Sequence, residues 1–186
     1  MSGSLLKFKK TYSVKIGGRQ YPVVKIGNQL WLAENLKYHT TVDFKYPNGS
    51  TDNEERYGLL YNSDGMDEIK SLNLSGYRMP SYSDIETLCT SFSDNYEALL
   101  DSSSDIWGGI GTNLSGFSAV PSGSYNNGSV SYNVFGSEQI VWTDTLYPSP
   151  QVRYCRMGIG AGFVYYTGSA AGVSNYFSIR LVKDAT

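Results

Sequence analysis

The side chains that could perform acid–base or nucleophilic chemistry are few in this chain of 186 residues. His39 is the only histidine, and it lies in the polar segment Lys37-Tyr-His-Thr-Thr41. A Ser-His-Asp or Cys-His site needs an imidazole that accepts the proton of the nucleophile. Because the only imidazole lies in a polar, loop-like segment, we expect His39 to be a solvated side chain and the protein not to be an enzyme.

Cys89 and Cys155 are the other candidates for chemistry, as thiols or as metal ligands. A zinc site needs four nitrogen or sulfur ligands at workable spacing, and one histidine with two distant cysteines cannot supply them. Cys89 continues an apolar helical repeat that begins at Ile85, and Cys155 lies in a strand pattern. We therefore expect two buried free thiols, which behave as small hydrophobic side chains, and no metal or cofactor.

The net charge argues against a nucleic-acid partner, and the lack of long apolar runs argues against membrane insertion. Fifteen basic and seventeen acidic residues leave a net charge of −2, whereas a protein that neutralises nucleic-acid phosphates is far more basic. No apolar run approaches the length of a membrane span, and the first ten residues lack the apolar stretch of a signal peptide. We expect no nucleic-acid partner and no direct membrane insertion.

Charge is also distributed unevenly along the chain. Between Ile106 and Val182 the charged residues are Glu138, Asp144, Arg153, Arg156 and Arg180. Within that stretch, residues 146–176 are rich in Tyr, Ser and Gly, with two arginines and no acidic residue. Tyrosine provides a large amphipathic contact at low entropic cost, and Ser, Gly and Asn adapt around it, as in antibody paratopes. This segment is therefore the candidate binding surface.

Alternation along a strand predicts which of its side chains share a face. Cys155 and Met157 face one way, and Tyr154 and Arg156 face the other. The same alternation places Arg153 on the Cys155 side, unless it lies at a frayed start of the strand. The residues that we expect at or near an exposed ligand-binding surface are Tyr147, Gln151, Arg153, Tyr154, Arg156, Tyr165, Tyr166, Ser169, Asn175 and Tyr176. The alternative is that these tyrosines only cover the core of a small domain.

The elements that position these residues follow from hydrophobic periodicity and turn residues. The clearest helix starts at Ser81, which forms a capping box with Asp84. Weaker helical patterns cover 63–70 and 94–101. Strand patterns cover 12–16, 21–26, 57–61, 116–120, 138–143, 152–157, 162–167 and 176–182, with turns at Gly17-Gly18 and at 125–128. Together they predict a single α+β domain over residues 12–184, preceded by an extension or tag remnant at 1–11.

An ordered series of motifs resembles a known family. The motifs are Gln29-Leu-Trp-Leu-Ala-Glu-Asn-Leu36, Tyr57-Gly-Leu-Leu-Tyr-Asn62, Gly76-Tyr-Arg-Met-Pro-Ser81, Gly116-Phe-Ser-Ala-Val-Pro-Ser-Gly123, Val141-Trp-Thr-Asp-Thr145 and Phe177-Ser-Ile-Arg-Leu-Val-Lys183. Their order over roughly residues 12–184 resembles the Fibrobacter succinogenes major paralogous domain, a family of bacterial secreted or surface-borne modules. One departure is Asn73-Leu-Ser, where that family usually has Cys-Pro before the glycine.

The same frame resembles the C-type-lectin-like fold of the formylglycine-generating-enzyme type. That resemblance implies two or three helices, a small twisted antiparallel sheet, long loops that present a ligand surface near the C-terminal strands, and neighbouring N- and C-terminal strands. Trp142-Thr-Asp144 is similar to a calcium-binding sequence of C-type lectins, but Thr replaces Asn and the accompanying Glu-Pro-Asn or Gln-Pro-Asp loop is missing. Calcium needs six to eight oxygen ligands, so we expect no calcium site.

The resemblance and the composition together favour a non-catalytic recognition module, secreted or carried on a cell surface or phage particle. Its expected ligand is a protein or glycan on another cell or particle. Some proteins with this frame are receptor-binding proteins whose C-terminal region is made hypervariable by diversity-generating retroelements. Two alternatives stay open: a structural or adhesin-type domain that uses the same surface for oligomer contacts, and an enzyme of the formylglycine-generating kind that uses a cysteine pair.

Overall fold

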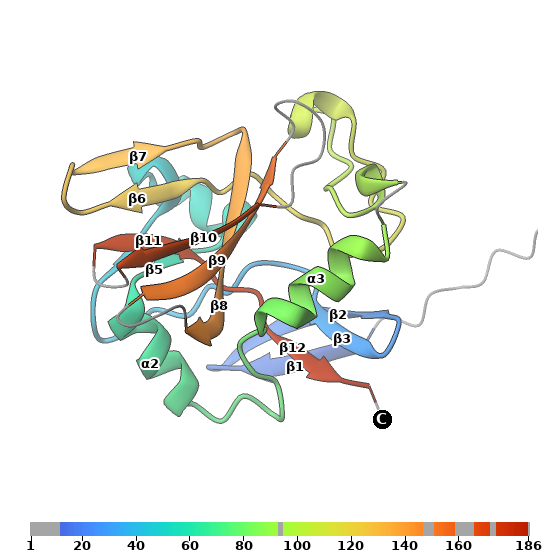
Figure 1. Ribbon diagram of the computed structural model, residues 1–186, viewed down its shortest axis with the longest axis horizontal. Helices are drawn as coiled ribbons and strands as arrows, with labels where there is room; N and C mark the ends of the chain where they lie inside the picture. The colour runs from blue at the N-terminus through green and yellow to red at the C-terminus, as the bar shows by residue number, and fades with distance from the viewer. Residues whose placement is uncertain (1–11, 93–94, 147–150, 159–165, 172–173, 186) are drawn as a thin grey trace, which may run out of the picture.

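The computed structural model describes residues 12–92, 95–146, 151–158, 166–171 and 174–185. The predicted extension at 1–11 lies outside the described residues. Within them the fold is α+β, with three α-helices and two curled, mainly antiparallel sheets (Figure 1). None of the helices that the structure describes is long and apolar enough to cross a membrane.

The first sheet joins the two ends of the described chain. Its strand order is β1-β2-β3-β12, with β1 at Tyr12–Ile16, β2 at Arg19–Ile26, β3 at Gln29–Leu32 and β12 at Val182–Asp184. Gly17 and Gly18 form the β1–β2 turn with φ of 57° and 86°, a region that glycine adopts without strain. The predicted hairpin is confirmed. The C-terminal strand β12 shares this sheet with the N-terminal strands and pairs with β3, but β1 and β12 lie at opposite edges and are not direct neighbours.

The second sheet has the order β10-β9-β8-β11-β5-β4, and a hairpin of β6 and β7 pairs with β11. In this sheet β8 and β11 run parallel, and the other pairs are antiparallel. The strands are β4 Phe44–Lys45, β5 Leu60–Tyr61, β6 Ser124–Asn126, β7 Ser131–Asn133, β8 Glu138–Leu146, β9 Gln151–Gly158, β10 Tyr166–Ala171 and β11 Asn175–Ser178.

The helices are α1 at Glu54–Tyr57, α2 at Ser63–Ser71 and α3 at Tyr82–Thr90. The capping box of α3 is confirmed: the Ser81 hydroxyl accepts a hydrogen bond from the Asp84 amide, and the Asp84 carboxylate accepts one from the Ser81 amide. In Figure 1, α3 lies beside β2 and β3 on one side and β9 on the other. Its buried stripe includes Cys89, as predicted.

Two predicted elements are wrong in detail. Residue 94 lies outside the described residues, and 95–101 form only a 3-10 turn at Tyr96–Ala98. The strand expected at 116–120 is reduced to an isolated parallel bridge between Leu100 and Ala119. The backbone explains both results, because the Ala119 amide donates to the Leu99 carbonyl and the Asp101 amide donates to the Ala119 carbonyl. These contacts between the two segments take the place of a regular helix and a regular strand.

Two apolar clusters lie on either side of the β8–β9 ladder. Ile140 and Trp142 of β8 belong to the first cluster, which also takes in side chains of the first sheet and of α2. Cys155 and Met157 of β9 belong to the second cluster, beneath α3. The predicted last strand is broken into β11 and β12, yet its apolar residues Phe177, Ile179 and Leu181 share the first cluster, as the alternation predicts.

Candidate functional site

The ten residues predicted to bind a ligand are only partly described. Tyr147 and Tyr165 lie outside the described residues. Gln151 lies in β9, and Tyr166 and Ser169 lie in β10, where the description covers their backbone and not their side chains. Side chains are described for Arg153, Tyr154, Arg156, Asn175 and Tyr176.

Strand β9 presents these residues on two different faces. Cys155 and Met157 are fully buried, whereas Tyr154 and Arg156 are half-buried on the other face, so the predicted alternation is confirmed. The Arg153 guanidinium lies 4.9 Å from the centre of the Tyr82 ring on α3, which places it on the Cys155 side. A frayed start is wrong for Arg153, because it pairs with Ser169 of β10. Arg153 and Tyr154 therefore cannot share one flat patch.

The side chains on the second face of β9 take part in packing. The Tyr154 ring lies 4.8 Å from the Phe177 ring and 6.5 Å from the Trp142 ring, centre to centre. Arg156 Nε donates to a carboxylate oxygen of Glu138 at 2.7 Å. The Tyr154 ring is thus partly exposed and packs against the edge of the first core cluster.

Tyr176 corrects the sequence prediction. Its side chain is 2% exposed rather than at the surface. Its ring lies 5.5 Å from the Tyr125 ring, and its hydroxyl donates to an Asp43 carboxylate oxygen at 2.8 Å. Burial, together with the hydrogen bond to Asp43, raises the pKa of Tyr176 to about 12. Tyr176 is buried because Asp43, which precedes β4, and Tyr125 of β6 contact it, although both are remote in the sequence.

The hairpin β6–β7 presents an exposed, uncharged turn that was not among the predicted site residues. The turn residues 127–130 are exposed, and no residue from 124 to 137 is charged. Asn126 of β6 donates its amide to Asn175 Oδ1 of β11 at 2.9 Å, so the hairpin lies directly beside a predicted site residue. The sequence carried a usable signal, because Ser124-Tyr-Asn-Asn-Gly-Ser-Val-Ser-Tyr-Asn133 contains the Tyr, Ser and Gly that also mark 146–176.

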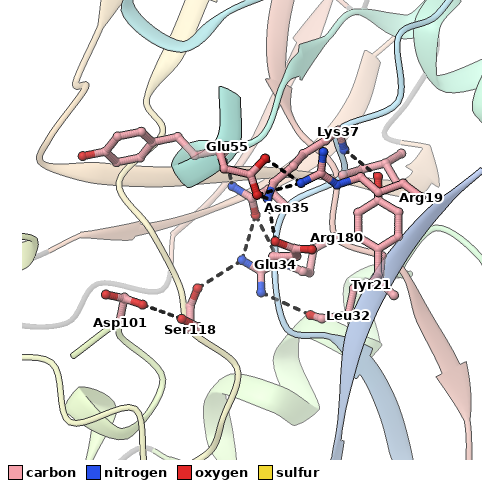
Figure 2. Close-up of polar contacts among 12 residues, drawn as sticks. Arg19, Tyr21, Leu32, Glu34, Asn35, Lys37, Glu55, Asp101, Ser118 and Arg180 are labelled. Carbon is pink, nitrogen blue, oxygen red and sulfur yellow. Dashed lines mark hydrogen bonds and ion pairs between the residues drawn. The ribbon is translucent and has the colours of Figure 1, made fainter. Parts of the chain in front are cut away.

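A second polar cluster surrounds Arg180, whose side chain is fully buried (Figure 2). Arg180 Nε and one terminal nitrogen donate to Asn35 Oδ1 at 3.0 and 2.8 Å. Further hydrogen bonds go to the backbone carbonyls of Leu32, Phe117 and Ser118. Burial lowers the pKa of Arg180 to about 9, partly offset by the more distant carboxylates of Glu34 and Asp101.

A cavity of about 230 Å³ lies next to this cluster. Glu34, Arg56, Asp101 and Ser118 are among its lining residues. Their polar groups already have protein partners: Glu34 accepts from Lys37 at 2.6 Å, Asp101 accepts from Ser118 at 2.6 Å, and Arg56 pairs with Asp105. The arrangement therefore ties loops to the core.

The groups considered for catalysis are His39 and the two cysteines. His39 is exposed, as predicted, with its Nε2 2.9 Å from a Glu54 carboxylate oxygen. Both thiols are buried and free, as predicted. Across the part of the chain that the structure describes, no three His, Cys, Asp or Glu side chains gather where they could hold a metal ion.

The family model of the Fibrobacter succinogenes major domain matches residues 24–183. The chain belongs to this family. No curated protein and no solved structure matches it.

In this Fibrobacter succinogenes major domain, the motifs that carried the resemblance meet in the interior. Asn35 of the first motif binds Arg180 of the last. Trp142 Nε1 donates to the Tyr61 carbonyl at 2.6 Å, joining two more. The Arg78 amide donates to the Val182 carbonyl at 2.8 Å. These residues of the motifs thus hold the scaffold together.

Proposed function

We propose that this domain is a non-catalytic recognition module that binds a protein or glycan. The binding surface is the hairpin surface, which we define as residues 124–133 together with strand β11, with which β6 pairs. The observation that carries this proposal is the pairing of β6 with β11, in which Tyr125 stands opposite Tyr176 and Asn126 opposite Asn175. That pairing places two segments of paratope-like composition side by side.

The chemistry of the hairpin surface suits recognition by neutral contacts. Asn127, Ser129 and Asn133 are exposed and supply amide and hydroxyl groups that both donate and accept hydrogen bonds. Val130 at the tip is 75% exposed and adds an apolar contact. Such a surface selects partners by shape and hydrogen bonding.

The hairpin surface rests on a rigid support. The Tyr125 ring lies 4.8 Å from the Tyr132 ring and 5.5 Å from the Tyr176 ring. The Lys45 ammonium lies 5.5 and 5.4 Å from the centres of the Tyr125 and Tyr176 rings and pairs with Asp43. Because these anchors hold the hairpin before a ligand arrives, less conformational entropy is lost on binding.

Backbone strain at Val130, at the tip of the hairpin, also supports the hairpin surface as the binding surface. Val130 has φ of 50°, in the left-handed region that a β-branched residue rarely adopts. Such strain costs on the order of 1 kcal/mol or more and concentrates at functional sites. A strained apolar residue at an exposed tip contributes nothing to the core.

The decisive experiment separates binding from stability. A printed glycan array and a phage-displayed peptide library are screened with the wild-type domain, and the strongest ligand is then titrated against variants. We expect Val130→Asn combined with Asn127→Ala to weaken binding at least about tenfold, because a central contact at such a surface contributes 1–2 kcal/mol. Thermal unfolding should stay unchanged or improve, since Asn tolerates the left-handed region.

Leu114→Asn is the matched control, because Leu114 is 68% exposed and lies outside the hairpin surface. This variant should bind like the wild type. Equal binding by the tip variant and the wild type would remove the hairpin surface from the proposal.

The C-type-lectin-like fold, and a location outside the cell or on a phage particle, belong to the same proposal. The shared sheet of β1, β2, β3 and β12 supports the fold assignment, since it joins both ends of the domain as that fold requires. Hypervariability would concentrate substitutions in 146–176 among natural copies. The competing function is an adhesin-type or structural domain, and the exposed side chain of Val130 favours it. Sedimentation of the wild type and of Val130→Asn tests this alternative. An oligomer that forms with the wild type and not with the variant would support it.

A further inference from the structure

The two cysteines lie on different elements that pack against each other. Cys89 lies on α3 and Cys155 on β9. Both are free, with 4% and 0% of their surface exposed, and both belong to the second core cluster. The sequence contains no other cysteine.

The two thiols also interact directly. Burial raises the pKa of Cys155 well above its ordinary value, and a hydrogen bond with the Cys89 side chain raises it further. The Cys155 thiol therefore stays protonated while α3 is packed on β9, and it is then inert because the thiolate is the reactive form. A transient opening of this packing exposes both thiols at once.

We propose that Cys89 and Cys155 form an intramolecular disulfide that ties α3 to β9 when the domain meets a disulfide oxidant. A thiolate of one cysteine attacks a sulfur of glutathione disulfide and releases one glutathione thiolate. The second cysteine attacks the protein sulfur of this mixed disulfide and releases the other. Two protein thiols are oxidised, one glutathione disulfide is reduced to two glutathione molecules, and the two protons go to the released thiolates.

The disulfide would fix the position of β9, the strand that carries several of the predicted site residues. Arg153 and Tyr154 immediately precede Cys155 on β9, and Tyr82 on α3 packs under the Arg153 guanidinium. A disulfide between α3 and β9 would hold this strand to the scaffold and close a long loop, which restricts the unfolded chain. This inference does not depend on the proposed recognition function.

The test uses the full chain, first reduced and then incubated with glutathione disulfide in buffer and in low, non-denaturing urea. We expect a monomeric product lighter by two hydrogens, resistant to alkylation, in which peptides containing Cys89 and Cys155 are linked. Urea should speed its formation, because opening limits the reaction. The melting temperature should rise by roughly 5 °C or more and return to its starting value with dithiothreitol.

Cys89→Ala and Cys155→Ala are matched controls, since each leaves one thiol and cannot form the bridge. Neither should show the rise in melting temperature, and Cys89→Ala alone suffices if the other variant fails to fold. Glutathione adducts on the wild type, disulfide-linked dimers, thiols that stay reactive after treatment in urea, or an oxidised monomer that melts lower would each overturn the proposal.

Discussion

Asn35 Oδ1 accepts two hydrogen bonds from the guanidinium of Arg180, at 3.0 and 2.8 Å, although the two residues lie at opposite ends of the domain sequence. The same oxygen accepts from Gln139 Nε2 at 2.7 Å. No carboxylate lies within ion-pair distance of Arg180 among the residues the structure describes. This buried cation is therefore held by an amide and backbone carbonyls.

Replacing Asn35 should destabilise the domain strongly. Asn35→Ala leaves a buried guanidinium without its main acceptor, so we expect the free energy of unfolding to fall by about 3 kcal/mol or more. Urea unfolding at neutral pH measures the loss. Asn127→Ala on the exposed hairpin is the control and should change the value by less than about 0.5 kcal/mol. A loss that small for Asn35→Ala would show that the network contributes little.

Asp84 should give the domain an acid-labile stability. Burial alone would raise the pKa of Asp84, but hydrogen bonds from Arg78 and Ser81 outweigh it and lower the pKa to about 2. Since this lies below the unfolded value near 4, the stabilisation is present above about pH 4 and is lost as the pH falls toward 2. After allowing for solvent screening we expect about 1 kcal/mol.

Urea unfolding of the wild type and Asp84→Asn between pH 6 and pH 2 measures this effect. The difference between the two proteins should shrink as the pH falls below 4. Asp67→Asn removes only an exposed pair with Lys70 and should stay close to the wild type throughout. A constant gap between the wild type and Asp84→Asn would contradict the assignment.

Tyr154 should contribute more to stability than an exposed binding residue would. Tyr154→Ala removes ring contacts with Phe177 and Trp142, so we expect a loss of about 2 kcal/mol. Tyr154→Phe keeps the ring and should retain most of that stability. Thermal unfolding of the two variants decides the point, and an unchanged melting temperature for Tyr154→Ala would make the ring a surface group.

Gly17 and Gly18 in the first hairpin test how closely the Tyr38 ring packs against the backbone. A Cβ on Gly17 would collide with the Tyr38 ring, whereas one on Gly18 would meet no atom within 4 Å. Both glycines have positive φ, so both alanine variants share the backbone cost of about 1 kcal/mol. Gly17→Ala should melt at the lower temperature, and the gap between the two variants measures the collision. Identical melting temperatures would show that Tyr38 moves aside freely.

The confirmed predictions depend on residues that are close together in the sequence. The Ser81–Asp84 capping box and the Gly17-Gly18 turn involve residues within one turn of each other, and both are confirmed. The sequence of 94–101 has a helical apolar pattern, yet the backbone of residues 97–101 forms hydrogen bonds with residues 112–119. A local pattern contains no information about that competing partner.

The sequence by itself determined the scaffold: its motifs identify the family, its periodicity places α3 and the first hairpin, and alternation sorts the faces of β9. Only the tertiary structure decided which polar side chains are buried. Tyr176 is covered by Asp43 and Tyr125, and Arg180 by Asn35 and the Phe117 carbonyl. Burial is a sum over neighbours brought together by the folded chain, so residues of the same type, such as Tyr154 and Tyr176, end in different environments.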